Sequence, residues 1–381
     1  MKKTLIAMAA LAATGAFAQV TIGGNFDQTA YNQGSGTTGA NAWTHNSNST
    51  SVLTLSGSKD LGDGLKGGFN LVSEVNLMKG QIGSTSTGAA ATTGQSVDIF
   101  NRGANVNLSG GFGTVTIGRQ TDLWFSTQGS LNTSGSNSFG FSNLTSYVSN
   151  GAAVARLMGA TPATAVAGDY AVNGANDTNS GTAPFVFASG VGYTSPNFSG
   201  FQAGVQSLNS NYANGGNRNG AALNITYGNG PLKLAAATSN RNDATGTSNA
   251  WVNTVYGGSY TMGAFTVIAA INKTSFSGAY SAADNMTATS LGLNYVISPK
   301  IDMNVAYGTL ADDTNSANKA TQLGLTARYK LPDGVTLYAG IGNVKNEGAA
   351  TIGSIYAGGG VTATEKDTTT SAYMLGLKYA F

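Results

Sequence analysis

The residue types that most often carry out chemistry are scarce in this chain of 381 residues. There is one histidine, His45, and no cysteine, so a catalytic triad has no base other than His45, and no second histidine can share a metal ion with it. His45 lies among Asn, Ser and Thr, and we expect it to be solvated. We therefore predict no enzyme activity, no catalytic residue, no metal and no cofactor.

Charged side chains are also few, at 9% of residues against about 25% in an ordinary soluble domain. Some lie on the polar side of segments in which apolar and polar residues alternate, and these are the best candidates to face water inside a folded structure: Lys66, Glu74, Lys233, Arg328 and Lys378. The alternative is that they lie at the ends of their segments, solvated and without a specific role.

The alternation itself predicts the elements that position these residues. In the last segment, large apolar residues at every second position from Tyr373 to Phe381 are separated by small, charged or flexible ones. This is the period of a β-strand with one face toward lipid and the other toward water. The pattern recurs from Val20 onward and predicts sixteen strands that begin near residues 19, 51, 65, 99, 114, 185, 201, 221, 231, 250, 264, 289, 300, 321, 335 and 370.

The N terminus has the order of a secretory signal peptide. Lys2 and Lys3 precede a short apolar run and the small residues that end at Ala18, so we predict a signal peptide over 1–18 and a barrel domain over 19–381. No stretch of the chain approaches the roughly 20 apolar residues of a transmembrane helix. Without the two leader lysines the chain has 17 basic and 17 acidic residues, which argues against nucleic-acid binding.

Two folds fit this composition: a secreted solenoid rich in Gly, Ser and Asn, or a closed membrane barrel. Short connectors such as 61–64, 228–230 and 331–334 alternate with long polar stretches, as in outer-membrane barrels. In lipid an open sheet edge costs several kcal/mol for each unpaired backbone group. We therefore predict an all-β, antiparallel barrel in which Phe381 pairs with the first strand at Val20.

The longest connector, 121–184, exceeds the usual length of a structureless loop. Because sixteen strands leave a wide, water-filled lumen, we expect this loop to fold inward and narrow it. A floppy external loop or a surface cap remains the alternative. Its charged residues are Asp122, Arg156, Asp169 and Asp177.

Several motifs resemble the trimeric general porins of the Gram-negative outer membrane. They are Phe100-Asn101-Arg102 followed by 108–120 (LSGGFGTVTIGRQ), the turn 61–66 (LGDGLK), the hairpin 193–201 (YTSPNFSGF) and the aromatic terminus up to Phe381. The resemblance implies a homotrimer of sixteen-stranded barrels whose third loop forms an eyelet between wall arginines and loop carboxylates. It also implies partners: outer-membrane lipid and lipopolysaccharide, small hydrophilic solutes, and a barrel assembly machinery that recognises Tyr379 and Phe381.

The resemblance places Arg102 and Arg119 on the wall of the eyelet, but two other wall positions lack their arginines, at Ser51-Val52 and at Val186-Phe187. Ser138 stands where relatives carry an acid in the loop. Because opposed rows of positive and negative charge sustain each other, losses on both sides predict weak ion selectivity. The predicted constriction residues are Arg102, Arg119, Lys66, Glu74, Asp122, Arg328 and Ser138.

The direction of two arginines stays open at this point. Arg102 shares its parity with Val106 and Leu108, so simple alternation turns it outward, toward a subunit interface. Arg119 shares the parity of Ile117, but a bulge at Gly118 would turn it inward. Small or polar residues at outward positions of the early strands are expected at the trimer contact: Gly67, Gly103, Asn105 and Asn107.

The predicted function is passive diffusion of small hydrophilic solutes and ions across the outer membrane. One alternative is a substrate-specific channel for sugars or organic solutes, in which loop aromatics form a sliding surface: Trp124, Phe125, Phe139, Phe141 and Tyr147. Another is a surface adhesin or structural barrel with a plugged lumen.

Overall fold

A computed structural model of the chain describes residues 19–35, 38–83, 99–148, 187–209, 219–242, 249–277, 285–352, 356–357, 360–361 and 366–381. The predicted signal peptide, 1–18, and residues 149–184 of the long connector lie outside the described residues. None of the helices in the described part of the chain is long and apolar enough to cross a membrane.

Antiparallel strands make up most of the described chain, in agreement with the alternating pattern of the sequence. The wall is built from β1 (Gln19–Ser35), β2 (Thr38–His45), β3 (Val52–Gly62), β4 (Leu65–Asn76), β6 (Gly103–Gly110), β7 (Gly113–Thr121), β8 (Phe187–Thr194), β9 (Phe201–Asn209), β10 (Gly220–Asn229), β11 (Leu232–Asn242), β12 (Asn249–Met262), β13 (Phe265–Phe276), β14 (Met286–Ser298), β15 (Ile301–Asp312), β16 (Lys319–Lys330), β17 (Val335–Glu347) and β20 (Thr369–Ala380). Short extra pairings are β5 (Gln81–Ile82) with β4, and β18 (Tyr356–Ala357) with β19 (Gly360–Val361).

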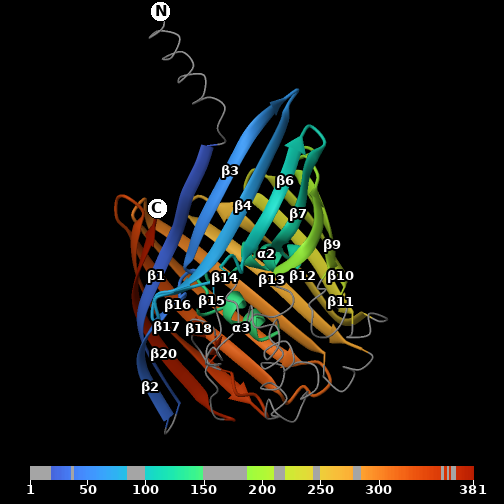
Figure 1. Cartoon of the computed structure of the whole chain (residues 1–381). Coiled ribbons are helices and arrows are strands. Elements are labelled where there is room, and N and C mark those ends of the chain that lie inside the picture. Colours follow the sequence, from blue (N-terminus) through green and yellow to red (C-terminus); the bar gives the residue numbers. More distant parts are fainter. Residues whose placement is uncertain are drawn as a thin grey trace, which may run out of the picture.

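The sheet closes on itself, with the first strand beside the last (Figure 1). β1 pairs with β20 from Asn25↔Ala380 to Gly34↔Ser371. Phe381 then exchanges two backbone hydrogen bonds with Gly24, at 3.0 and 3.1 Å. The predicted closure onto the first strand is thus confirmed, but the partner of Phe381 is Gly24 and not Val20. Val20 pairs on the other edge of β1, with Gly57 of β3.

β2 and β3 act as one wall strand, because both pair with the same edge of β1. The 18-stranded sheet therefore forms a ring of sixteen wall strands once the two-residue β5 is set aside. Observed and predicted strand starts differ by four residues or fewer, except that the second wall strand already begins at β2. Residues 46–51 form a detour between β2 and β3, which we call the inward bulge.

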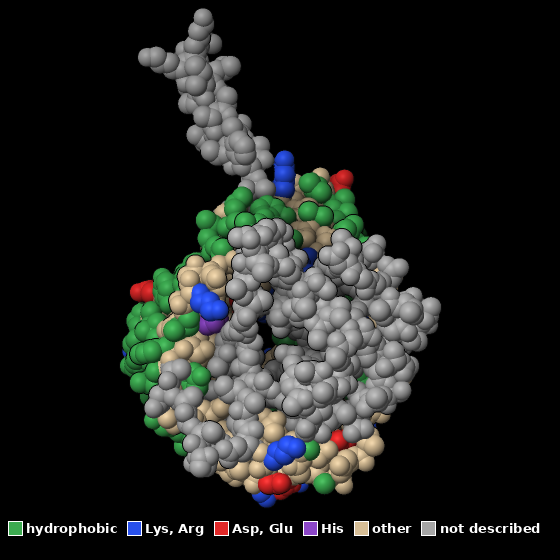
Figure 2. Space-filling view, turned by 60° about the horizontal axis from the view of Figure 1, so that its bottom comes forward, with side chains coloured by type: hydrophobic (Ala, Val, Ile, Leu, Met, Phe, Trp, Pro, Cys, Tyr) green, Lys and Arg blue, Asp and Glu red, His purple; other side chains and the backbone are tan. Residues whose placement is uncertain are grey.

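The two faces of the wall differ in chemistry. In β20, Tyr373 and Leu375 are 58% and 65% exposed, while Ala372 and Met374, which alternate with them, are 5% and 2% exposed. Figure 2 shows hydrophobic side chains gathered on the outer wall. The buried positions of the opposite parity carry many Asn, Gln, Ser and Thr side chains, including Asn253, Asn272, Asn304 and Gln322.

On β6 the predicted outward positions are partly wrong. Val106 and Leu108 are 57% and 40% exposed and face outward, so Asn105 and Asn107 face the lumen. The Asn105 Nδ2 donates to Arg119 O at 2.8 Å. Gly103 shares this inward parity and pairs with Val72, whereas Gly67 pairs with Leu108 and is outward as predicted.

The first half of the long connector folds against the inner face. It contains α2 (Leu123–Ser130) and α3 (Phe141–Val148), and α2 contacts β9 to β12 while α3 contacts β13 to β15. Both helices are drawn within the outline of the barrel (Figure 1). The wall residues that they and the segment between them touch have the buried parity, which puts this part of the connector in the lumen.

Candidate functional site

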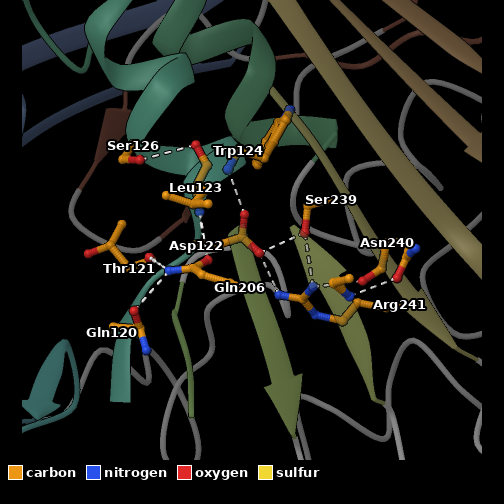
Figure 3. A network of polar contacts seen from close by, with 11 residues as sticks. Gln120, Thr121, Asp122, Leu123, Trp124, Ser126, Gln206, Ser239, Asn240 and Arg241 are labelled. Atoms are coloured by element: carbon orange, nitrogen blue, oxygen red, sulfur yellow. Dashed lines mark hydrogen bonds and ion pairs between the residues drawn. The ribbon is translucent and has the colours of Figure 1, made fainter. Parts of the chain in front are cut away.

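The connector enters the lumen at Asp122, whose side chain is fully buried. Its Oδ1 accepts the Trp124 backbone N–H at 2.7 Å and so caps α2, as an acid at a helix N-terminus does. Its Oδ2 accepts from Ser239 Oγ and from Arg241 Nη2, both at 2.7 Å, on β11 (Figure 3). The Arg241 side chain is only 3% exposed, so the negative charge of Asp122 is neutralised where it lies.

The connector then follows the wall through contacts with amides and glycines. The Trp124 indole N–H donates to Asn272 Oδ1 at 2.8 Å, and Asn304 Nδ2 donates to Thr133 O at 2.8 Å. Phe139 lies in a hollow over three wall glycines, where a Cβ on Gly342 would stand 2.5 Å from the Phe139 ring. Gly340 and Gly324 leave room for the same residue, so these small side chains accommodate the connector.

A second inward element, the inward bulge 46–51, meets the connector from the other side. The Ser138 backbone N–H donates to Ser47 O at 2.9 Å, and that of Asn137 donates to Asn48 O at 3.2 Å. The bulge also reaches the wall, because Asn46 Nδ2 donates to Glu74 Oε1 at 2.8 Å. Ser138 is fully buried in this joint. His45, predicted to be solvated, is only 4% exposed at the end of β2, next to the bulge.

Glu74 and Arg102 form an ion pair on the inner wall. Arg102 Nη1 lies 2.7 Å from Glu74 Oε2, and the side chains are 15% and 6% exposed. The guanidinium also lies 4.6 Å from the centre of the Phe187 ring, which packs edge-on against Phe125 of α2 at 6.2 Å. Since α2 is in the lumen, Arg102 faces inward, although its parity suggested the opposite.

Arg119 belongs to the same cluster. Its Nε donates to Asn101 O at 2.5 Å, and its guanidinium lies 5.9 Å from the Phe187 ring centre. The preceding Gly118 has a φ of 120°. The ladders with β6 and β8 keep their register there, so a glycine-only backbone conformation redirects Arg119 and the suggested bulge is absent.

Arg328 forms a third charged group on the inner wall. Its Nε lies 2.6 Å from Asp302 Oδ1, and Lys330 Nζ lies 2.8 Å from Asp302 Oδ2. Its Nη1 donates to Gly135 O of the connector at 2.6 Å. Arg328 therefore both balances an acid and holds the connector to the wall.

Asp27 is a fourth buried acid of the lumen. It is fully buried and accepts the Tyr338 hydroxyl at 2.6 Å and the Ser49 backbone N–H at 2.9 Å. Lys378 stands directly opposite it in the β1–β20 ladder, on the same inward parity. Asp27, Glu74, Asp122 and Asp302 thus all have a basic residue beside them.

Most of the predicted constriction residues come together around the connector. Glu74, Arg102 and Arg119 share one cluster. Asp122 and Arg328 bind the connector to the wall, and Ser138 binds it to the inward bulge. Lys66 is separate, since it is exposed at the turn end of β4, opposite Asp60 and Ser109. Sequence reasoning missed Arg241, Asp302, Asp27 and Phe187 as partners. For Asp302, the alternation was a usable signal, because this residue lies on the polar parity of β15.

The three loop aromatics whose side chains the structure describes, Trp124, Phe125 and Phe139, do not form an open sliding surface. Trp124 and Phe139 are both fully buried against the wall. Phe125 is half-buried and packs on Phe187. The side chains of Phe141 and Tyr147 lie outside the described part of the chain.

Comparison with known proteins identifies the family. A model of the Gram-negative porin family matches residues 4–349. The chain belongs to the Gram-negative porin family. It is 30% identical to outer membrane porin protein 32 of Delftia acidovorans over 404 residues, with all of both chains covered. The porin resemblance of the sequence motifs is thus confirmed.

Solved structures have the same fold. The anion-selective porin from Comamonas acidovorans aligns with a TM-score of 0.75 at 22% identity, covering 96% of this chain and all of that one. OmpT of Vibrio cholerae, in its trimer form, aligns with a TM-score of 0.63 at 14% identity over 95% and 99% of the two chains. As a member of this family, the chain is an outer-membrane barrel that forms a channel for passive diffusion of small solutes.

Proposed function

We propose that this porin is a homotrimeric, weakly ion-selective diffusion channel whose connector 121–184 sets the size limit for solutes. The charge balance of the lumen carries the proposal. Four of the five buried acids in the described residues have a basic residue beside them, and three of these four form ion pairs of 2.6 to 2.8 Å. The fifth, Asp312 at the end of β15, accepts from the backbone N–H groups of Thr314 and Asn315 and from Asn318 Nδ2.

Paired charges affect a passing ion less than separated rows do. A carboxylate and a guanidinium in contact have a field that falls off faster with distance than that of one charge, and salt screens it further. The lumen therefore presents mostly amide and hydroxyl groups to a solute. The relative from Comamonas is described as anion-selective, and we expect this chain to be less selective than that name implies.

The constriction and the trimer are parts of the same proposal. Contacts from Asp122 to Phe139 hold the connector against the wall, which supports a fixed narrowing and argues against a floppy external loop. The trimer form of the OmpT structure supports three copies. The outward residues of the early strands available for that contact are apolar, such as Leu55, Phe69 and Val106.

Recordings from single molecules in planar bilayers test the proposal. In a tenfold gradient of potassium chloride, the reversal potential, of either sign, should be smaller than about one third of the value for ideal selectivity. Three equal conductance steps should appear for each inserted molecule. A reversal potential near the ideal value would contradict weak selectivity, and single-step closures only would contradict the trimer.

A further inference from the structure

The outer surface carries a groove that the channel function does not use. It has a volume of about 460 Å³ and lies across β12 to β15. Its outward lining is mostly apolar and includes Tyr256, Leu291 and Tyr307, which are 40%, 55% and 50% exposed. Between them the lining residues are small, Gly258 and Ala269, so the wall is hollowed there.

A lysine stands next to this groove on the outer face. Lys273 follows Ile271 of the groove lining on the same side of β13, about 7 Å farther along the strand at 3.3 Å per residue. It lies toward the end of the strand that leads into the long connection 277–285. It has no ion pair and no hydrogen bond within the described chain, whereas the outward Lys319 and Lys345 are both paired with Glu347.

Hydroxyl groups surround Lys273. Thr254 and Thr287 are its neighbours in the ladders to β12 and β14. On the strands beyond, Thr238 lies 3.1 Å from Thr254, and Thr309 lies 2.8 Å from Thr289 of the groove. Asp313 is the acid on this side, and its Oδ2 accepts the Thr287 hydroxyl at 2.9 Å.

We propose that this groove and Lys273 together bind one phosphorylated lipid of the leaflet at the long-loop side. An acyl chain fills the apolar groove between Tyr256 and Tyr307, and the lipid phosphate lies on the Lys273 ammonium, with threonine hydroxyls as further donors. A lysine facing lipid is costly when it has no counter-ion, and a phosphate supplies one at the membrane surface.

The position in the ring favours lipid over a second copy of the chain. In the order of the sheet, β13 is eight wall strands from β4 in either direction. It is thus opposite the early strands, where the trimer contact is proposed. In a lipid, the acyl chains adjoin a charged headgroup. An apolar groove that ends at a cation matches this arrangement.

Native mass spectrometry of the detergent-purified porin tests this site. The probes are a bisphosphorylated lipid A and the same lipid without phosphates. We expect Lys273→Gln to weaken binding of the phosphorylated lipid about fivefold, the usual effect of one lysine at a membrane surface, and to leave the phosphate-free lipid unchanged. Ala269→Phe, which fills the groove, should weaken binding of both lipids.

Matched variants on β17 serve as controls. Lys345→Gln makes the same charge change at an outward lysine, and Ala339→Phe adds the same ring to an outward alanine. Both should bind lipid as the unmodified chain does. Equal losses in Lys345→Gln and Lys273→Gln, or no loss in Lys273→Gln, would overturn the site. Loss of the trimer in Ala269→Phe would overturn the lipid site and assign the groove to a subunit contact. Conductance should be unchanged in all these variants, so failure of the lipid site and failure of the channel proposal can be told apart.

Discussion

At the scale of single residues, the charges of Glu74, Asp122 and Asp302 are each neutralised by a neighbouring arginine. Glu74 is the clearest case, because it receives Arg102 Nη1 at 2.7 Å and Asn46 Nδ2 at 2.8 Å, and its own backbone N–H donates to Asn101 Oδ1. Alternation placed Glu74 on the inner face, but its partner Arg102 has the wrong parity for that face. The pair exists because Arg102 precedes β6, where the chain does not yet follow the strand period.

Glu74→Gln is expected to make the channel more selective for anions. The substitution keeps an acceptor for Asn46 and leaves the Arg102 charge without its counter-ion. One unit charge at about 7 Å in water changes the energy of an ion by about 0.6 kcal/mol, so the permeability of each ion should shift about threefold, upward for chloride and downward for potassium. Reversal potentials before and after the substitution measure this shift.

Glu347→Gln provides the control for that substitution. Glu347 is an outward acid of β17 that pairs with Lys319 and Lys345, outside the lumen. The same loss of charge there should leave the reversal potential unchanged. An equal shift in both variants would mean that the net charge of the protein, and not the pair in the lumen, sets selectivity.

At the scale of elements, the connector and the wall are shaped to each other. Phe139 has a φ of 60°, and Gly140 after it has a φ of 87°, so the chain turns sharply there and presses the Phe139 ring onto the glycines of β16 and β17. Gly324 is the tightest of these contacts, since a Cβ at this position would overlap Phe139 Cβ.

Gly324→Val is expected to lower single-channel conductance. The new side chain cannot share the space of Phe139, so the connector must move away from the wall and toward the open part of the lumen. The barrel itself should form, because the substituted residue stays within a strand that favours β-branched side chains. Conductance at fixed salt is the measurement.

Gly228→Val is the matched variant for that experiment. Gly228 lies at the end of β10, and a Cβ added there would have no neighbouring atom within 4 Å, so a valine has open space around it. Its conductance should equal that of the unmodified channel. A rise in conductance in Gly324→Val would mean that the connector leaves the lumen when it is displaced.

The sequence predicted the elements better than their junctions. Alternation located the wall strands because the two-residue period is imposed by lipid on one side and water on the other along every strand. It missed β2 and the inward bulge, since the polar residues 46–51 look like a loop tip when their bonds to Asp27 and Asn137 are unknown. It also missed the inward turn of Arg119, because a φ of 120° at Gly118 breaks the inference from parity.

At the scale of the whole molecule, closure depends on the last residue. Phe381 completes the ladder to β1 through two backbone hydrogen bonds with Gly24, and its ring packs against Phe26 at 5.3 Å and Tyr379 at 5.8 Å. It is 45% exposed on the outer face. The backbone bonds close the barrel, while the exposed ring is available to the assembly machinery that we propose recognises it.

These two roles of Phe381 separate in an assembly experiment. In Phe381→Ala the backbone bonds to Gly24 remain, so refolding into lipid vesicles without other proteins should give nearly the normal yield of barrel, measured by heat-dependent mobility on gels. In cells, where the assembly machinery would recognise the ring, the yield of assembled channel should fall about tenfold.

Leu375→Ala is the control, because it removes an outward side chain of the same strand that is 65% exposed, and it should assemble normally in both settings. Equal losses of Phe381→Ala in vesicles and in cells would assign the ring to barrel stability alone, because a recognition signal has no effect where its reader is absent.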